Sequence, residues 1–76
     1  MAKSKKSAAE AVYKVVEVIG TSPTSWEDAA ANAVAAAAET LRDLRIAEVV
    51  KQDMKVEDGK VTAYRTRVLL SFKYEN

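Results

Sequence analysis

The sequence contains no cysteine and no histidine, and only two glycines and one proline among its 76 residues. Without thiols and imidazoles there is no disulfide, no Ser-His-Asp triad, no cysteine nucleophile and no zinc site built on these ligands. Two glycines are also too few for a glycine-rich phosphate-binding loop. We therefore expect a protein that is not an enzyme. Any metal would bind through oxygen, as calcium and magnesium do.

No charge of one sign dominates, and long hydrophobic runs are absent. Twelve basic against eleven acidic side chains leave a net charge of +1, which is too small to attract nucleic acid. A membrane-spanning helix needs about 18 or more apolar residues in a row, and a signal peptide needs an apolar run after its charges. We expect a cytoplasmic protein without nucleic-acid or membrane partners, consisting of a flexible basic tail (1–10) and one domain (11–76).

The apolar fraction is 49%, but 14 of these residues are alanine, so few large side chains remain to build a core. A chain of this size buries only about 60% of the surface that it exposes when unfolded. Because no disulfide compensates, the composition favours self-association.

Residues 11–19 are rich in β-branched side chains and predict a strand, which Gly20 would end. The next helix has two possible starts, which the sequence leaves open. Ser22 fits a cap followed by Pro23, and Thr24 fits a capping box with Glu27. The helix is expected to continue through 27–44. Its apolar stripe consists of Trp26, Ala30, Ala33, Val34, Ala37, Leu41 and Leu44.

From Arg45 the pattern changes to a period of two, and Asp58-Gly59 predicts a tight hairpin turn between two strands. The last strand, 61–74, has two faces. One carries Tyr64, Val68, Leu70, Phe72 and Tyr74, and the other carries Arg65, Arg67, Leu69, Ser71 and Lys73. The predicted class is α+β, in the order β-α-β-β. Because one helix covers only one sheet face and the first strand is apolar on both, we expect a symmetric homo-oligomer.

The segment Val18-Ile19-Gly20-Thr21-Ser22, followed by Pro23 to Ala29, 40–45, 47–50 and 64–72, resembles the dodecin family. The likeness covers about residues 12–75. It implies a three-stranded antiparallel sheet that partly wraps one long helix. It also implies a hollow homododecamer of a bacterial or archaeal protein that stores or sequesters a small ligand.

Within that family, flavin-binding members stack the flavin on a tryptophan and hydrogen-bond its edge with a glutamine. The matching positions are Ile46 and Arg65. An aromatic stacking pair contributes about 0.5–1.5 kcal/mol beyond area burial, and arginine offers donors but no acceptor. The residues 23–27, 52–54, Tyr64 and Arg65, with an aliphatic residue at 46, are instead similar to the calcium dodecin subgroup. This implies calcium as the ligand. Alternatives are a flavin dodecin with a modified pocket for riboflavin or FMN, and a structural oligomer without a ligand.

The calcium ligands are not evident from the sequence, and no EF-hand loop is present. Two groups of oxygen-bearing residues are candidates: Ser25, Glu27 and Asp28 at the helix start, and Asp53, Glu57 and Asp58 on the second strand and its turn. Glu17 or Glu48 could add ligands at a symmetry axis. The alternative is that these carboxylates serve the helix dipole or lie solvated in a turn.

Arg65 and Arg67 share one face of the last strand. We interpret them as partners of Glu17, Glu48 or Asp43 in ion pairs between subunits. The alternative is a pocket for an anion or phosphate, which the guanidinium fork binds at two points. Trp26 is interpreted as a core residue.

Overall fold

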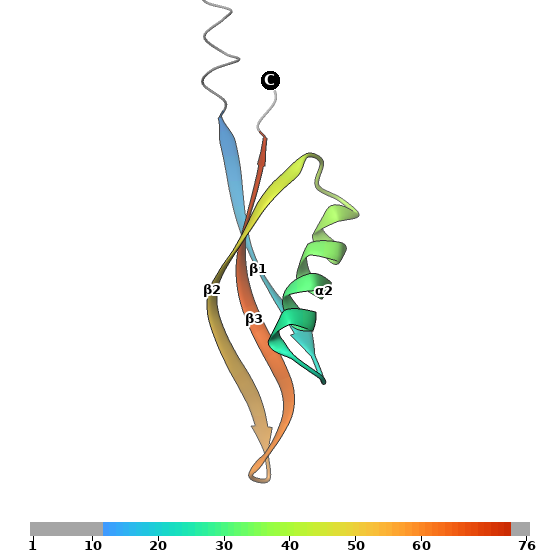
Figure 1. Ribbon diagram of the computed structural model, residues 1–76, viewed down its shortest axis with the longest axis vertical. Coiled ribbons are helices and arrows are strands. Elements are labelled where there is room, and N and C mark those ends of the chain that lie inside the picture. The colour runs from blue at the N-terminus through green and yellow to red at the C-terminus, as the bar shows by residue number, and fades with distance from the viewer. Residues whose placement is uncertain (1–11, 74–76) are drawn as a thin grey trace, which may run out of the picture.

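The computed structural model describes residues 12–73 (Figure 1). Its elements are, in order, β1 (Tyr13–Ser22), α2 (Trp26–Ala38), β2 (Leu44–Glu57) and β3 (Lys60–Lys73). The predicted β-α-β-β order is therefore confirmed. The expected tail at 1–10, and the expected places of Ala11 and Tyr74, lie outside the described residues. Within 12–73, no helix is long and apolar enough to cross a membrane.

The three strands form one antiparallel sheet in the order β1-β3-β2, so the last strand is the central one. The turn of the β2–β3 hairpin has positive φ at both central residues, 53° at Asp58 and 76° at Gly59. Such angles are typical of the two-residue hairpin turns that Asp-Gly favours, which confirms the predicted hairpin. The β2–β3 register shifts at three places, the last of them between Lys55 and Val56.

Ser25 caps the helix, so both predicted starts are wrong by a short distance. The backbone of Ser25 is extended, and its Oγ accepts a hydrogen bond from the Asp28 N–H at 3.0 Å. The other two candidate caps have a different role. Ser22 Oγ donates to Asp28 Oδ2 at 2.8 Å and lies 3.0 Å from Thr24 Oγ1, so these hydroxyls hold the turn before the helix.

The helix ends at Ala38, with Glu39 as its C-cap, and the prediction that it continues to Leu44 is wrong. The chain instead turns back through 39–43, where Asp43 has a φ of 58°. This reversal is required because β2 runs along the sheet in the direction opposite to α2 (Figure 1). The apolar Leu44, which fits the helical stripe in the sequence, is the first residue of β2.

Gly20 lies inside β1 and does not end the strand, contrary to the prediction. A Cβ at this position would lie 2.0 Å from the carbonyl oxygen of Ala29 and 2.9 Å from the Cβ of Ala33. The glycine is therefore needed for the close approach of α2 to the sheet. Its function is packing rather than termination.

The core lies between α2 and one face of the sheet (Figure 1). Its buried apolar residues are Ala29, Ala33, Val68 and Leu70, with Val16, Val18, Ala30, Val34, Ala37 and Leu44 partly buried around them. The predicted faces of the last strand are confirmed, because Val68 and Leu70 are buried and the alternate residues are not.

The opposite face of the sheet has no covering layer within residues 12–73. Val15 and Ile19 on β1 and Ile46 on β2 are 54%, 46% and 57% exposed. A sheet that buries one face only leaves this second apolar surface to water or to another molecule.

Candidate functional site

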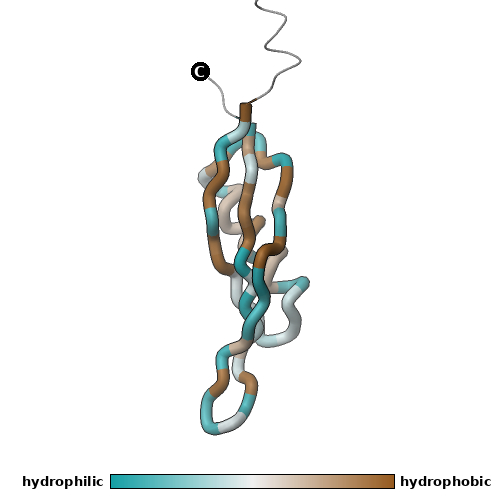
Figure 2. Tube along the Cα trace, turned by 90° about the vertical axis from the view of Figure 1, so that its left-hand side faces the viewer, coloured by the Kyte–Doolittle hydropathy of each residue, from teal (hydrophilic) through white to brown (hydrophobic). Residues whose placement is uncertain are grey.

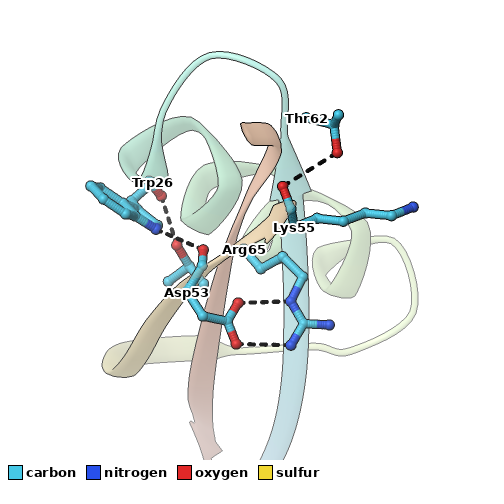
Figure 3. Close-up of polar contacts among 6 residues, drawn as sticks. Trp26, Asp53, Lys55, Thr62 and Arg65 are labelled. Atoms are coloured by element: carbon cyan, nitrogen blue, oxygen red, sulfur yellow. Dashed lines mark hydrogen bonds and ion pairs between the residues drawn. The ribbon is translucent and has the colours of Figure 1, made fainter. Parts of the chain in front are cut away.

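A two-point ion pair joins Asp53 of β2 to Arg65 of β3, which lie opposite each other in the sheet. Arg65 Nε donates to Asp53 Oδ1 at 2.7 Å and Nη2 donates to Oδ2 at 2.8 Å (Figure 3). This two-point contact matches the guanidinium fork to both carboxylate oxygens, a geometry that a lysine could not supply.

The pair lies in a cationic environment. The hydrogen bond from Arg65 holds the pKa of Asp53 below its usual 3.8, against the opposing effect of desolvation, and the charges of Lys51 and Arg67 act in the same direction as Arg65. The hydrogen bond to Asp53 in turn raises the pKa of Arg65 above its usual value. Both groups are therefore charged at neutral pH, and each satisfies the other.

Trp26 connects this pair to the helix. Its indole N–H donates to the backbone oxygen of Asp53 at 3.0 Å, as Figure 3 shows. Its ring lies edge-on to Tyr64, with centroids 5.1 Å apart, and its own carbonyl accepts a bond from Thr66 Oγ1 at 2.9 Å. The half-buried ring thus packs the first turn of α2 against both strands, although Trp26 is not among the residues of the core cluster.

Arg67 has its partner in the same chain. Its Nε lies 3.5 Å from Glu17 Oε2 on the neighbouring strand β1. The prediction named Glu17 as a partner but placed the pair between subunits, and it did not name Asp53 as the partner of Arg65. Both arginine forks are thus engaged with carboxylates within one chain, which leaves less of them available to an external anion.

Ile46 lies far from Arg65 along the sheet, opposite Ser71. It belongs to the rim of an apolar depression of about 120 Å³. The depression is lined by Val34, Leu44, Arg45, Ile46, Ala47 and Leu70. Apart from Arg45, its lining residues are aliphatic, and none of them is aromatic.

The carboxylates predicted as calcium ligands do not converge in one chain. Asp28 accepts the Ser22 hydroxyl, and the adjacent Glu27 is exposed. In the second group, Asp53 is held by Arg65, and Glu57 Oε2 lies 3.3 Å from Lys55 Nζ. Within residues 12–73, no three acidic residues come together as a metal site would require. At these carboxylates, a calcium site within one chain would depend on backbone carbonyls and water for most of its six to eight oxygens.

The comparisons with known proteins agree with one another. The family described as Dodecin matches residues 12–75. The calcium dodecin of Mycobacterium tuberculosis is 56% identical over 63 residues, which are 82% of this chain and 87% of that protein.

Solved structures give the same result. The crystal structure of the M. tuberculosis protein, described as calcium chelating and as having a novel calcium-binding site, matches with a TM-score of 0.75 and 52% identity, over 84% of this chain and 91% of that one. A dodecin from Streptomyces coelicolor matches with a TM-score of 0.84 and 38% identity, over 90% of this chain and 97% of that one.

Proposed function

The chain belongs to the dodecin family, and on this premise we propose that it is a non-enzymatic binding protein that assembles as a homododecamer and binds calcium rather than flavin.

The assembly is supported by the amount of apolar surface that one chain leaves uncovered. Ten large apolar side chains are exposed, while the buried apolar core of residues 12–73 consists of two alanines, Val68 and Leu70. Each additional Å² of apolar surface removed from water contributes about 25 cal/mol, so contact between copies would stabilise the chain substantially.

The Asp53–Arg65 ion pair is the main observation that argues against flavin as the ligand. At the position where flavin dodecins place a glutamine, this chain has a guanidinium already bound at two points. A flavin edge would have to displace a carboxylate from it. At the stacking position, Ile46 offers no ring face, and no aromatic residue lines the depression beside it. Neither Arg65 nor Ile46 is therefore suited to binding flavin.

Calcium is supported by the likeness to a calcium-chelating relative and by the available donors. Glu27 and Asp28 are the preferred ligands. Both are exposed, and within residues 12–73 neither has a cation within ion-pair distance, whereas Asp53 and Glu57 each do. Carboxylates of this kind from neighbouring copies would provide the hard oxygen ligands that calcium prefers.

Native mass spectrometry tests the assembly and the ligand together. The protein is measured as purified, after chelation, with added calcium and with added riboflavin. We expect a twelve-subunit mass that gains calcium and not riboflavin. A flavin-bearing dodecamer would overturn the choice of ligand, and a monomer would overturn the assembly. A dodecamer that binds neither would make this a structural oligomer.

Two double variants then distinguish between the two candidate groups of calcium ligands. Glu27→Gln with Asp28→Asn removes two charges at the helix start while keeping an oxygen that can accept the Ser22 hydroxyl. Glu57→Gln with Asp58→Asn removes two charges at the hairpin turn. We expect the first to weaken calcium binding at least about tenfold, and the second to leave it within about twofold, in calorimetric titration. The opposite ranking would place the calcium at the hairpin. Glu39→Gln, at the C-terminal end of the helix, is the matched control for charge removal.

A further inference from the structure

The hairpin tip, residues 55–62, extends past the start of the helix and beyond the core (Figure 1). Val56 and Val61 face each other across its two strands, are 59% and 46% exposed, and do not belong to the core cluster. Figure 2 shows hydrophobic colour on both strands beside the turn. The tip is therefore a mainly charged and polar projection that carries one exposed pair of valines outside the core cluster of residues 12–73.

The tip is also well formed. Thr62 Oγ1 donates to the Lys55 carbonyl at 3.3 Å, Lys55 pairs with Glu57 at 3.3 Å, and the Asp58-Gly59 turn has the angles that a two-residue hairpin requires. A contact through this tip would cost little ordering of the chain, which favours its use in binding.

At the other end of β2, the chain has an apolar depression that suits an aliphatic side chain such as valine. The 120 Å³ depression has the buried Leu70 at its floor and the exposed Ile46 at its rim. An apolar cavity of about 150 Å³ takes up a benzene molecule, so this depression has room for one branched aliphatic side chain.

The hairpin tip cannot fill the depression of its own chain. Ala47 in the depression and Val56 in the tip are nine positions apart on one continuous strand. At about 3.3 Å per residue they are separated by about 30 Å. Any contact between the two must join different molecules.

Charges at the two places are complementary. Arg45 lines the depression, and its Nη2 lies 3.9 Å from Asp43 Oδ1, with 47% and 41% of the two side chains exposed. The tip carries Asp58 and Lys60 next to its valines. An approaching tip would therefore offer an anion to Arg45 and a cation to Asp43.

From this match in size, polarity and charge we propose that the hairpin tip of one copy docks, through Val56 and Val61, into the depression of a second copy. The contact is heterologous, because different surfaces meet, and it closes into a ring when the rotation between copies permits. The inference rests on the proposed assembly and identifies two of its contacting surfaces.

Disulfide trapping tests the contact, and the chain has no native cysteine to interfere. Ala47→Cys with Val61→Cys is oxidised and compared with Ala47→Cys with Ala31→Cys, in which the second thiol lies on the exposed face of α2. We expect a ladder of linked chains for the first pair on a non-reducing gel and single chains for the second. Equal cross-linking in both, or none in the first, would overturn the proposed contact.

Val61→Asp provides a second readout. Because Val61 is exposed in the single chain, we expect unchanged far-UV circular dichroism and a rise of at least about tenfold in the apparent dissociation constant of the assembly. If the wild-type protein is a monomer, the proposed assembly itself fails. If the wild type is assembled but Val61→Asp assembles equally well and the 47–61 pair does not cross-link, the docking contact alone is wrong.

Discussion

Arg65 holds Asp53 at two points, with Nε 2.7 Å from Oδ1 and Nη2 2.8 Å from Oδ2. The backbone oxygen of the same aspartate accepts the indole N–H of Trp26, so this one residue joins the two longest strands to the helix. Under the proposed function, the same pair also withholds the Arg65 guanidinium from flavin, so a structural bond and the proposed choice of ligand depend on one contact.

Replacing Asp53 by Asn should reduce the acid sensitivity of the fold. The pKa of Asp53 is lowered in the folded state, chiefly by the hydrogen bond from Arg65. Its contribution to stability is therefore complete above the usual pKa of 3.8 and is lost as the pH falls through the lower folded value. We expect the urea midpoint of the wild type to fall below pH 3.8 more steeply than that of Asp53→Asn, at a fixed protein concentration.

Asp58→Asn is the matched control for this titration, because Asp58 lies in the hairpin turn without an ion pair among residues 12–73. Asparagine also tolerates the positive φ of this position, so we expect Asp58→Asn to fold normally. It should then keep the acid sensitivity of the wild type. Parallel pH profiles for the wild type and Asp53→Asn would show that the ion pair contributes nothing in solution.

Gly20→Ala adds only one methyl group, but it should still destabilise the fold. The new Cβ would meet the Ala29 carbonyl oxygen and the Ala33 Cβ, neither of which can turn away as a flexible side chain would. Overpacking of this kind costs about 1–3 kcal/mol, and occasionally more. Urea unfolding measures this cost. Thr21→Ala, at the exposed neighbouring position, should stay within about 0.5 kcal/mol of the wild type. Equal stability of Gly20→Ala and the wild type would refute the close approach of helix and strand.

Ser25→Ala should identify the true helix cap. The Ser25 hydroxyl accepts the Asp28 N–H, and loss of such a cap costs about 1 kcal/mol. Ser25→Asp should retain most of the stability, because its carboxylate also accepts this bond and suits the positive end of the helix dipole. The comparison is made by thermal unfolding. A neutral Ser25→Ala together with a costly Thr24→Ala would restore the capping box that the sequence suggests.

Much of the fold follows from local sequence patterns. The strands at 13–22 and 60–73 show the expected alternation, and Asp58-Gly59 forms the expected turn. The errors arise where tertiary contacts decide. Gly20 is a strand residue because α2 must approach it closely, and the helix stops at Ala38 because the chain must reverse to enter β2.

The Asp53–Arg65 pair shows why the site is harder to predict than the fold. An unbroken hairpin from the Asp58-Gly59 turn would place Asp53 opposite Tyr64. The register shift between Lys55 and Val56 moves Asp53 opposite Arg65 instead. A bulge of one residue is decided by packing and leaves no clear mark in the sequence. The candidate metal ligands remain predictions, because within residues 12–73 of one chain no three acidic residues come together.

Ile46→Trp combined with Arg65→Gln should make the assembly bind flavin, with the two residues supplied by different copies because they lie far apart in one chain. The tryptophan restores a ring face at a position that is exposed in the single chain, and the glutamine supplies both a donor and an acceptor. Arg65→Gln also leaves the Asp53 carboxylate unpaired, but because 46% of that side chain is exposed, water can solvate it. Quenching of riboflavin fluorescence measures binding. We expect none for the wild type and the strongest for the double variant. Ile46→Trp alone should quench less than the double variant, because Arg65 stays bound to Asp53. Strong quenching by the wild type would show that Ile46 and the Asp53–Arg65 pair do not exclude flavin, and the preference for calcium would then lose its structural basis.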